Sequence, residues 1–159
     1  MNKIVNWLGQ DMKFEGSLSS AIAKHEITNF PGGYIYDDGL FNIATDPEIP
    51  IKGYMISAIN KETLTIVDLT EEEREKLIDL ANRLLKAMHK TGFEKIMIYQ
   101  DEASSGNLHI NFIPRHEWTY QFHANFGEMG VYAKKNLNIN DEYKKELLDC
   151  IEKIKKNFK

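Results

Sequence analysis

The segment Asn107–Arg115 has the residue types and spacing best suited to chemistry in this sequence. It reads Asn-Leu-His-Ile-Asn-Phe-Ile-Pro-Arg. Successive side chains of a strand point to opposite faces, so Asn107, His109 and Asn111 are predicted to share one polar face, with the apolar residues between them facing a core. An imidazole flanked by two amides is able both to attack a phosphate and to hydrogen-bond it. The pattern is equally that of an ordinary half-exposed strand, and this alternative stays open.

This segment resembles the signature of the histidine-triad (HIT) nucleotide hydrolases and transferases, His-φ-His-φ-His-φ-φ with φ apolar, often followed by Pro-Arg. The apolar positions and the Pro-Arg ending match, whereas Asn107 and Asn111 stand where the family has its first and third histidines. The resemblance extends over about residues 33–115. It also includes Gly53-Tyr54, where the family often has Gly-His.

The resemblance implies that His109 is the catalytic nucleophile, forming a nucleotidyl intermediate on the α-phosphorus of a nucleoside phosphate. Neutral imidazole near pH 7 meets that requirement. The amides of Asn107 and Asn111 replace the hydrogen bonds of the missing histidines but not their proton transfer. Two functions therefore stay open: a hydrolase or nucleotidyltransferase acting through His109, which we favour, and a catalytically impaired nucleotide-binding or regulatory protein of the same fold.

Four further residues are predicted to bind the substrate. The stretch Ser104-Ser105-Gly106 takes the place of a phosphate-contacting loop of the family, although on its residues alone it is equally a solvated turn. Asp46 stands where relatives bind ribose, and a carboxylate accepts both hydrogen bonds of a vicinal diol, but Asp46-Pro47 is also a turn signal. Arg115 is predicted to contact phosphate or to support His109, with a surface ion pair as the alternative.

The elements around these residues predict an α+β domain. Strands are expected at 34–36, 40–44, 54–59, 94–99 and 107–113 from short β-type runs separated by turn signals. Thr70 before three glutamates predicts a helix start, and an apolar stripe continues to Gly92. A second helix is expected after Asn140-Asp141, and a short one over 17–24. The fold predicted is a HIT-like antiparallel sheet with a long inserted helix and a C-terminal helix.

The composition limits the number of domains and the kinds of partner and cofactor that are expected. The 159 residues, 42% of them hydrophobic, suit a single domain spanning 1–159. A net charge of −4 from 20 basic and 24 acidic residues provides no broad cationic field, so a nucleic-acid partner is not expected. The lone Cys150 and the absence of His-x-x-x-His or Cys pairs argue against a metal site, and we expect no cofactor.

The sequence also indicates where the protein works and with what. It has no apolar run of about 20 residues, and Met1–Gln10 is too polar for the core of a signal peptide, so we expect a cytoplasmic protein without a membrane partner. The resemblance implies a homodimer that takes a nucleotide or nucleotide conjugate as substrate.

Overall fold

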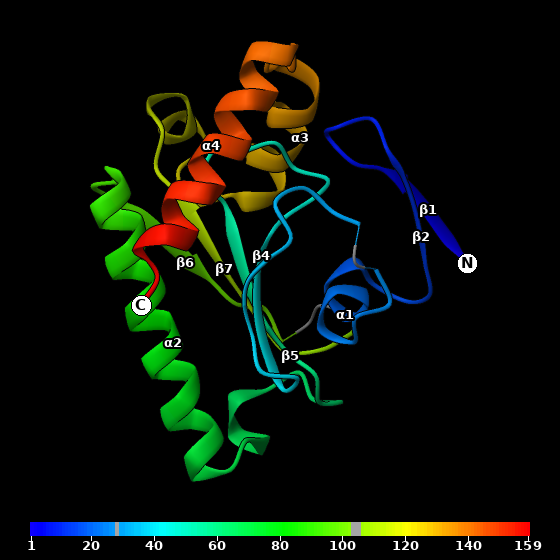
Figure 1. Cartoon of the computed structure of the whole chain (residues 1–159), viewed down its shortest axis with the longest axis vertical. Coiled ribbons are helices and arrows are strands. Elements are labelled where there is room, and N and C mark those ends of the chain that lie inside the picture. Colours follow the sequence, from blue (N-terminus) through cyan, green and yellow to red (C-terminus); the bar gives the residue numbers. More distant parts are fainter. Residues whose placement is uncertain (28, 103–105) are drawn as a thin grey trace.

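A five-stranded antiparallel sheet forms the centre of the computed structural model, which describes residues 1–27, 29–102 and 106–159 (Figure 1). The strand order is β3-β4-β5-β7-β6. The strands are β3 (Tyr34–Asp37), β4 (Phe41–Thr45), β5 (Met55–Ile59), β6 (Ile96–Tyr99) and β7 (His109–Pro114). The expected α+β sheet is therefore confirmed, with most boundaries within one residue and two strand starts shifted by two residues. The strand expected at 94 begins at Ile96, and the one expected at 107 begins at His109.

Helices cover both faces of the sheet. The helices are α1 (Leu18–Ala23), α2 (Glu71–Thr91), α3 (Phe126–Asn136) and α4 (Asp141–Asn157), with 3-10 turns η1 (Ile66–Asp68) and η2 (Glu117–Phe122). The long α2 and the C-terminal α4 pack on one side of the sheet, and α1 lies on the other (Figure 1). None of the helices in the described ranges is long and apolar enough to cross a membrane.

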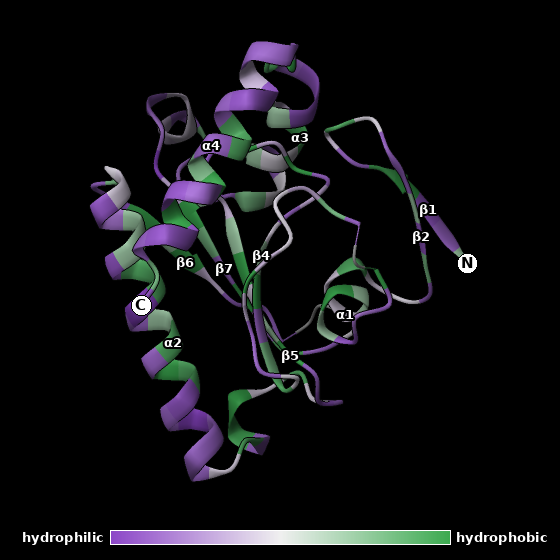
Figure 2. Cartoon of the chain, viewed as in Figure 1, coloured by the Kyte–Doolittle hydropathy of each residue, from purple (hydrophilic) through white to green (hydrophobic). Residues whose placement is uncertain are grey.

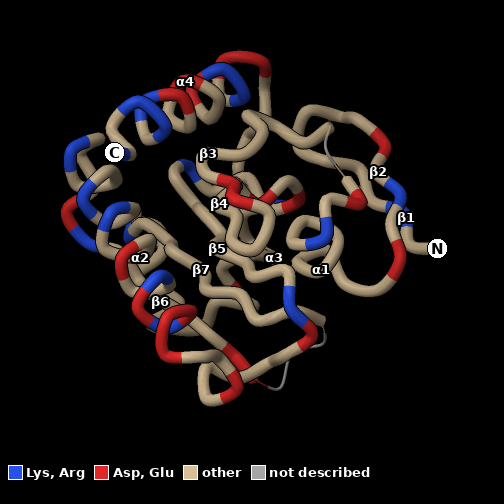
Figure 3. The backbone as a smooth tube through the Cα atoms, turned by 60° about the horizontal axis from the view of Figure 1, so that its bottom comes forward, with Lys and Arg blue, Asp and Glu red and all other residues tan. Residues whose placement is uncertain are grey.

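The predicted start and end of α2 are confirmed by its caps. The Thr70 hydroxyl accepts a hydrogen bond from the Glu73 amide, and the Glu73 carboxylate accepts one from the Thr70 amide, which makes a capping box. Gly92 ends the helix in the left-handed conformation at φ 110°, where a side chain would be strained. The apolar stripe of α2 turns toward the sheet, and its charged side faces outward (Figures 2 and 3).

Two apolar clusters fill the space on either side of the sheet. The first includes Phe41, Ile43, Ile110 and Phe112 with the buried faces of α2 and α4. The second lies on the α1 side and includes Ala44, Ile56 and Ala58. Small and medium side chains on this second face leave room beside the sheet, and it is here that His109 lies.

Two segments were not predicted from the sequence. Residues 1–28 were weakly patterned, yet β1 (Asn2–Val5) and β2 (Asp11–Phe14) pair as an antiparallel hairpin beyond α1 (Figure 1). The helix α3 was also missed, and it packs beside η2. Both segments are short and carry mixed polar and apolar residues, so their burial depends on neighbours that are distant in the sequence.

Candidate functional site

A hollow of about 330 Å³ contains three of the predicted site residues, Asp46, His109 and Asn111. It lies on the α1 side of the sheet, between α1, the turn after β4 and the first residue of α3. Its other lining residues come from five separate segments: Ser17, Leu18, Ser19, Glu48, Ile49, Tyr54, Ile56, Tyr99, Asp101 and Phe126.

His109 is oriented by the backbone of its own strand. It is the first residue of β7 and pairs across the sheet with Ala58, whose small side chain leaves the imidazole partly exposed to the hollow. Its Nδ1 lies 2.9 Å from the carbonyl oxygen of Asn107. Since a carbonyl only accepts, Nδ1 carries the hydrogen, and the neutral ring keeps its lone pair on Nε2. The imidazole is thus held in the tautomer that a nucleophile requires.

The alternation predicted for the strand is confirmed from Leu108 onward. Leu108, Ile110 and Phe112 are buried in the cluster shared with α2 and α4. His109 and Asn111 face the opposite side, beside Ala58 and Ile56 of β5.

The side-chain amide of Asn111 is already hydrogen-bonded within the protein. Its Oδ1 accepts a hydrogen bond of 2.7 Å from the Tyr54 hydroxyl, and its Nδ2 donates one of 3.2 Å to the Tyr99 carbonyl. One hydrogen on Nδ2 and one lone pair on Oδ1 are left for a ligand. The Asn111 hydrogen that remains on Nδ2 is the one able to donate to a phosphate oxygen.

Asp46 is a buried carboxylate at the edge of the hollow. Its Oδ1 accepts hydrogen bonds of 2.7 Å from both the Glu48 and the Ile49 amides, which confirms the turn that the sequence offered as an alternative. Burial raises the pKa of Asp46 to about 6, although these two backbone hydrogen bonds act in the opposite direction. Asp46 thus combines a turn-forming oxygen with a carboxyl that titrates near neutral pH.

Tyr54 lies between Asp46 and Asn111 in this network. Its side chain is buried, and its ring meets Phe126 edge-on with the centroids 5.5 Å apart. Burial, followed by the nearby Asp46 carboxylate, raises the pKa of the Tyr54 hydroxyl well above its usual value. Tyr54 therefore stays protonated and acts as a hydrogen-bond donor where the family often has histidine.

Asn107 lies just before the first residue of β7. Its Nδ2 donates to the carbonyl oxygens of Ile59 and Lys61 at 2.9 and 3.0 Å, and its backbone amide donates to the Ser20 hydroxyl. These bonds tie the approach to β7 to the end of β5 and turn the Asn107 side chain into a neighbouring hollow with Ser20. Its amide is therefore engaged by backbone carbonyls and lines a hollow next to that of His109, because the strand itself begins only at His109.

Arg115 lies away from His109 as well. One guanidinium nitrogen donates to the carbonyl of His123, and the guanidinium stands 4.7 Å from the centroid of the Tyr120 ring. It lines a different hollow, which also contains Lys52 and His116. Arg115 thus stabilises the 116–123 segment. Its position gives no evidence for the predicted phosphate contact. Ser104 and Ser105 fall outside the described residues.

Several lining residues were missed by the sequence analysis. Ser17 and Ser19 bring hydroxyls from the start of α1, where the sequence indicated only a helix cap. Tyr99 of β6 pairs with Asn111 of β7. This pairing depends on the register of the two strands, which the sequence pattern of residues 94–99 does not give. Nothing in the sequence indicated that Phe126 lines the site, because α3 itself was not predicted.

The charge of the hollow is acidic in the described part of the chain. Asp46, Glu48 and Asp101 line it together with His109, and no lysine or arginine is among the described lining residues. Glu48 is paired with Lys134 at 2.8 Å, and Asp101 accepts a hydrogen bond from the Tyr99 hydroxyl. Within residues 1–27, 29–102 and 106–159, no group of three or more His, Cys, Asp or Glu side chains is arranged to hold a metal ion.

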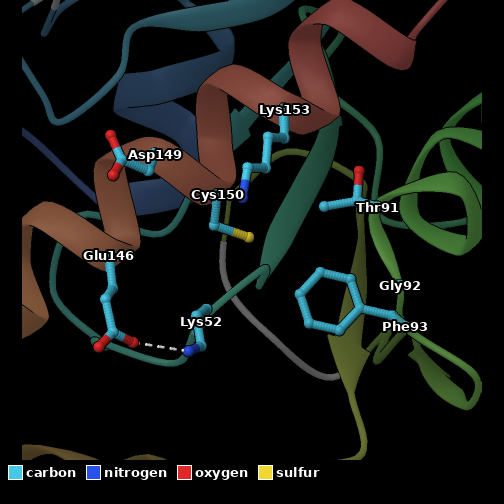
Figure 4. Close-up of a pocket in the computed structure, with 8 residues that line it drawn as sticks. All are labelled: Lys52, Thr91, Gly92, Phe93, Glu146, Asp149, Cys150 and Lys153. Carbon is cyan, nitrogen blue, oxygen red and sulfur yellow. Dashed lines mark hydrogen bonds and ion pairs between the residues drawn. The ribbon is translucent and has the colours of Figure 1, made fainter.

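A second hollow lies between the end of α2 and α4 (Figure 4). Lys52 and Glu146 form an ion pair of 2.7 Å at one side of it, and the Cys150 thiol and the Phe93 ring point into it. Burial raises the pKa of Cys150 to about 11, so its thiol is protonated and poorly nucleophilic at neutral pH. This hollow contains none of the predicted site residues.

Comparison with solved structures places this fold among known proteins. A HIT-like protein involved in cell-cycle regulation from Bartonella henselae is 20% identical, with a TM-score of 0.55 over 86% of this chain and 92% of its own. A hypothetical histidine triad nucleotide-binding protein from Sulfolobus tokodaii is 15% identical, with a TM-score of 0.61 over 89% and 93%. No family model and no curated sequence matches the chain.

The class that these observations define is therefore the histidine-triad fold, as the motif around His109 predicted. A zinc-bound histidine triad family protein from Mycobacterium smegmatis has the same fold at 16% identity, with a TM-score of 0.50 over 84% of this chain and 91% of its own. At such identities the comparison establishes the fold, and the chemistry has to be argued from the residues of the site.

Proposed function

We propose that this protein binds a nucleoside 5′-phosphate or a nucleotide conjugate in the hollow that contains His109 and that it transfers the nucleotidyl group through His109. The observation that carries the proposal is the hydrogen bond from His109 Nδ1 to the Asn107 carbonyl, which leaves the lone pair on Nε2. The neighbours in the fold include a protein described as nucleotide-binding.

The proposed reaction uses His109 Nε2 as the nucleophile. Nε2 attacks the α-phosphorus, the bond from phosphorus to the leaving group breaks, and the leaving group departs with that electron pair. The ring becomes positively charged, and the Asn107 carbonyl stabilises the Nδ1 hydrogen throughout. Water or an acceptor hydroxyl then attacks the same phosphorus, releases Nε2 and loses its proton to solvent, which yields hydrolysis or transfer.

The remaining lining residues bind the substrate in this proposal. The second hydrogen on Asn111 Nδ2 donates to a phosphate oxygen. The Ser17 hydroxyl already donates to Ser20, so the Ser19 hydroxyl, 3.1 Å from that of Ser17, is the one that would turn to donate to the ligand. The Asp46 oxygen that is not engaged in the turn accepts from the ribose hydroxyls. Ser104, Ser105 and Asn107 stay in the proposal as predicted phosphate contacts from the adjoining loop, although the amide of Asn107 has other partners.

The competing function is nucleotide binding without turnover. It is favoured by the state of Asn111, whose amide is already bonded to Tyr54 and Tyr99 and moves no proton at neutral pH. General acid–base assistance is typically worth about 10² to 10⁴ in rate, so its loss leaves a slow enzyme or none.

The experiment that separates the two functions is a search for the covalent intermediate. The protein is incubated with dinucleoside polyphosphates, nucleoside phosphoramidates and nucleotide sugars, and the peptide containing His109 is examined by mass spectrometry for a nucleotidyl adduct. The control variant is His123→Asn, because His123 is exposed, lies outside the hollow and has a φ of 52° that asparagine tolerates. An adduct in wild type and in His123→Asn but not in His109→Asn supports the transferase, and binding without an adduct supports the competing function.

The homodimer implied by the resemblance belongs to the same proposal. Among the described residues, β6 is the last strand of the sheet and pairs with β7 alone, so its outer edge is available to another strand. Ile98 on this strand is 55% exposed. Light scattering on wild type and on Ile98→Lys tests the proposal, since a dimer that uses this edge is expected to dissociate in the variant.

A further inference from the structure

Trp7, in the loop of the N-terminal hairpin, hydrogen-bonds the turn that carries Asp46. The Trp7 indole Nε1 donates a hydrogen bond of 3.0 Å to the backbone oxygen of Asp46. The Trp7 backbone amide donates another of 3.0 Å to the backbone oxygen of Pro47. A single residue, 39 positions away in the sequence, thus holds two consecutive carbonyls of this turn.

Trp7 is itself held in place by the loop between β1 and β2. The side chain of Asn6 is buried, and its Oδ1 accepts hydrogen bonds of 3.0 Å from both the Leu8 and the Gln10 amides. Its Nδ2 donates to the Gln10 side chain, and its backbone amide donates to the Gln10 carbonyl. Because these bonds fix the conformation of the loop on its own, the Trp7 indole has little freedom to move away from the Asp46 carbonyl.

The turn around Asp46 is therefore fixed from two sides. From within, its carboxylate accepts the Glu48 and Ile49 amides, and from outside, Trp7 donates to the carbonyls of Asp46 and Pro47. Because burying an ionised carboxylate is costly, the Asp46 carboxyl either takes up a proton or, if its turn opens, becomes hydrated. Trp7 opposes that opening, since it would break both of the bonds from Trp7.

We propose that Trp7 is a positioning residue that keeps the Asp46 carboxylate buried and directed into the hollow of His109, so that the N-terminal hairpin is part of the ligand site. The statement that Trp7 affects ligand binding rests on the proposed function. The statement that Trp7 positions the Asp46 carboxylate concerns the free protein alone.

The test substitutes Trp7→Phe, which keeps an aromatic ring and removes the indole N–H. The titration of the Asp46 carboxyl is followed by carbon NMR in the free protein. The groups that act on it are the amides of Glu48 and Ile49, the Glu48 carboxylate, Lys134 and the Tyr54 hydroxyl. We expect the midpoint to move from about 6 toward the ordinary aspartate range by about one pH unit or more, because the loosened turn hydrates the carboxylate.

A binding measurement with AMP forms the second arm. Trp7→Phe is expected to weaken the binding of AMP by about tenfold. The double variant Trp7→Phe with Asp46→Ala is expected to bind AMP no more weakly than Asp46→Ala alone, since Trp7 acts through Asp46. Val5→Ala is the matched control, because Val5 lies on the same hairpin and is 56% exposed. Asn6→Ala is the second variant if Trp7→Phe does not fold, and a smaller shift in the same direction is expected from it.

The outcomes separate the inference from the proposed function. An unchanged Asp46 titration in folded Trp7→Phe and Asn6→Ala overturns the inference, whatever the AMP affinities of these variants are. A shifted titration together with no AMP binding in any variant, wild type included, supports the positioning role and contradicts the proposed nucleotide site. Equal shifts in Val5→Ala overturn the inference too, because they show a general effect of the hairpin.

Discussion

The hydroxyl of Tyr54 donates a hydrogen bond of 2.7 Å to Oδ1 of Asn111, which joins residues 57 positions apart at the centre of the candidate site. Tyr54 directly precedes β5, and Asn111 lies on the adjacent β7. The bond determines how the Asn111 amide is turned, because it engages the oxygen and leaves the nitrogen to the Tyr99 carbonyl and the hollow. Two of the three positions at which the chain departs from the histidine-triad pattern, Tyr54 and Asn111, are thus partners of one another.

Tyr54→Phe tests this partnership. It removes the donor to Asn111 and leaves a buried acceptor unsatisfied, so we expect a loss of about 1–2 kcal/mol in the free energy of unfolding, measured in urea, and weaker binding of AMP, measured by calorimetry. Tyr143→Phe is the matched control, because the Tyr143 hydroxyl donates to the Pro50 carbonyl at 3.0 Å, outside the hollow. Equal losses of AMP affinity in the two variants would contradict a specific role for Tyr54.

Asn107 is expected to matter more for stability than for binding. Asn107→Ala leaves the Ile59 and Lys61 carbonyls without their donor, and Asn107→His is also unable to serve both, so each variant is expected to lose about 2 kcal/mol in urea denaturation. Asn111→His is expected to cost less, because Asn111 faces the hollow. Restoring histidine at both positions is therefore not expected to repair a triad; a stable, faster double variant would refute this account of Asn107.

Asp46 is expected to destabilise the folded protein above pH 6. Its pKa is about 6 when folded and about 3.8 in an ordinary aspartate, so between these values the folded state binds the proton and the unfolded state does not. The free energy of unfolding therefore falls as pH rises from about 4 to about 6 and loses on the order of 3 kcal/mol from this group. Asp46→Asn retains the turn acceptor and should show no such fall when unfolding is measured across this range. A parallel pH dependence in wild type and variant would show that Asp46 does not titrate in this way.

Ligand binding is expected to depend on Asp46 in the opposite direction. In the proposed site the ionised Asp46 carboxylate accepts the ribose hydroxyls, so AMP affinity should rise as pH passes through about 6 and level off above it. Binding of AMP is compared with that of 2′,3′-dideoxy-AMP, which lacks the diol, at pH 5 and pH 7.5. A preference for AMP that is equal at both values would exclude the carboxylate as the ribose contact.

Cys150 is expected to be unreactive in the folded protein. Its thiol is buried with a pKa of about 11, so the thiolate fraction at pH 7 is very small. Labelling with a disulfide reagent should proceed only after unfolding in urea. Lys156→Cys places an exposed thiol on the same helix and should label at once; rapid labelling of wild type would contradict the burial of Cys150.

The sequence by itself determined the elements whose patterns are local. The alternation from Leu108 to Ile113 predicted which side chains pack in the cluster shared with α2 and α4, since period two is a property of any strand. The cap at Thr70, the stripe of α2 and the glycine at its end depend on neighbours within four residues, and all three are confirmed. The motif around His109 was sufficient to indicate the fold, although two of its three histidines are missing.

Tertiary structure alone decided which polar residues meet. Asn107 and Asn111 are equivalent in the sequence pattern, yet one bonds the end of β5 and the other faces His109, because the first lies just outside the strand register. Tyr54 and Phe126 line the same hollow, and Trp7 hydrogen-bonds the turn that carries Asp46. Their convergence from three segments depends on sheet order and helix packing, which no local pattern encodes. The raised pKa of Asp46 has the same origin, because burial of a carboxylate is a property of the assembled fold rather than of the residue.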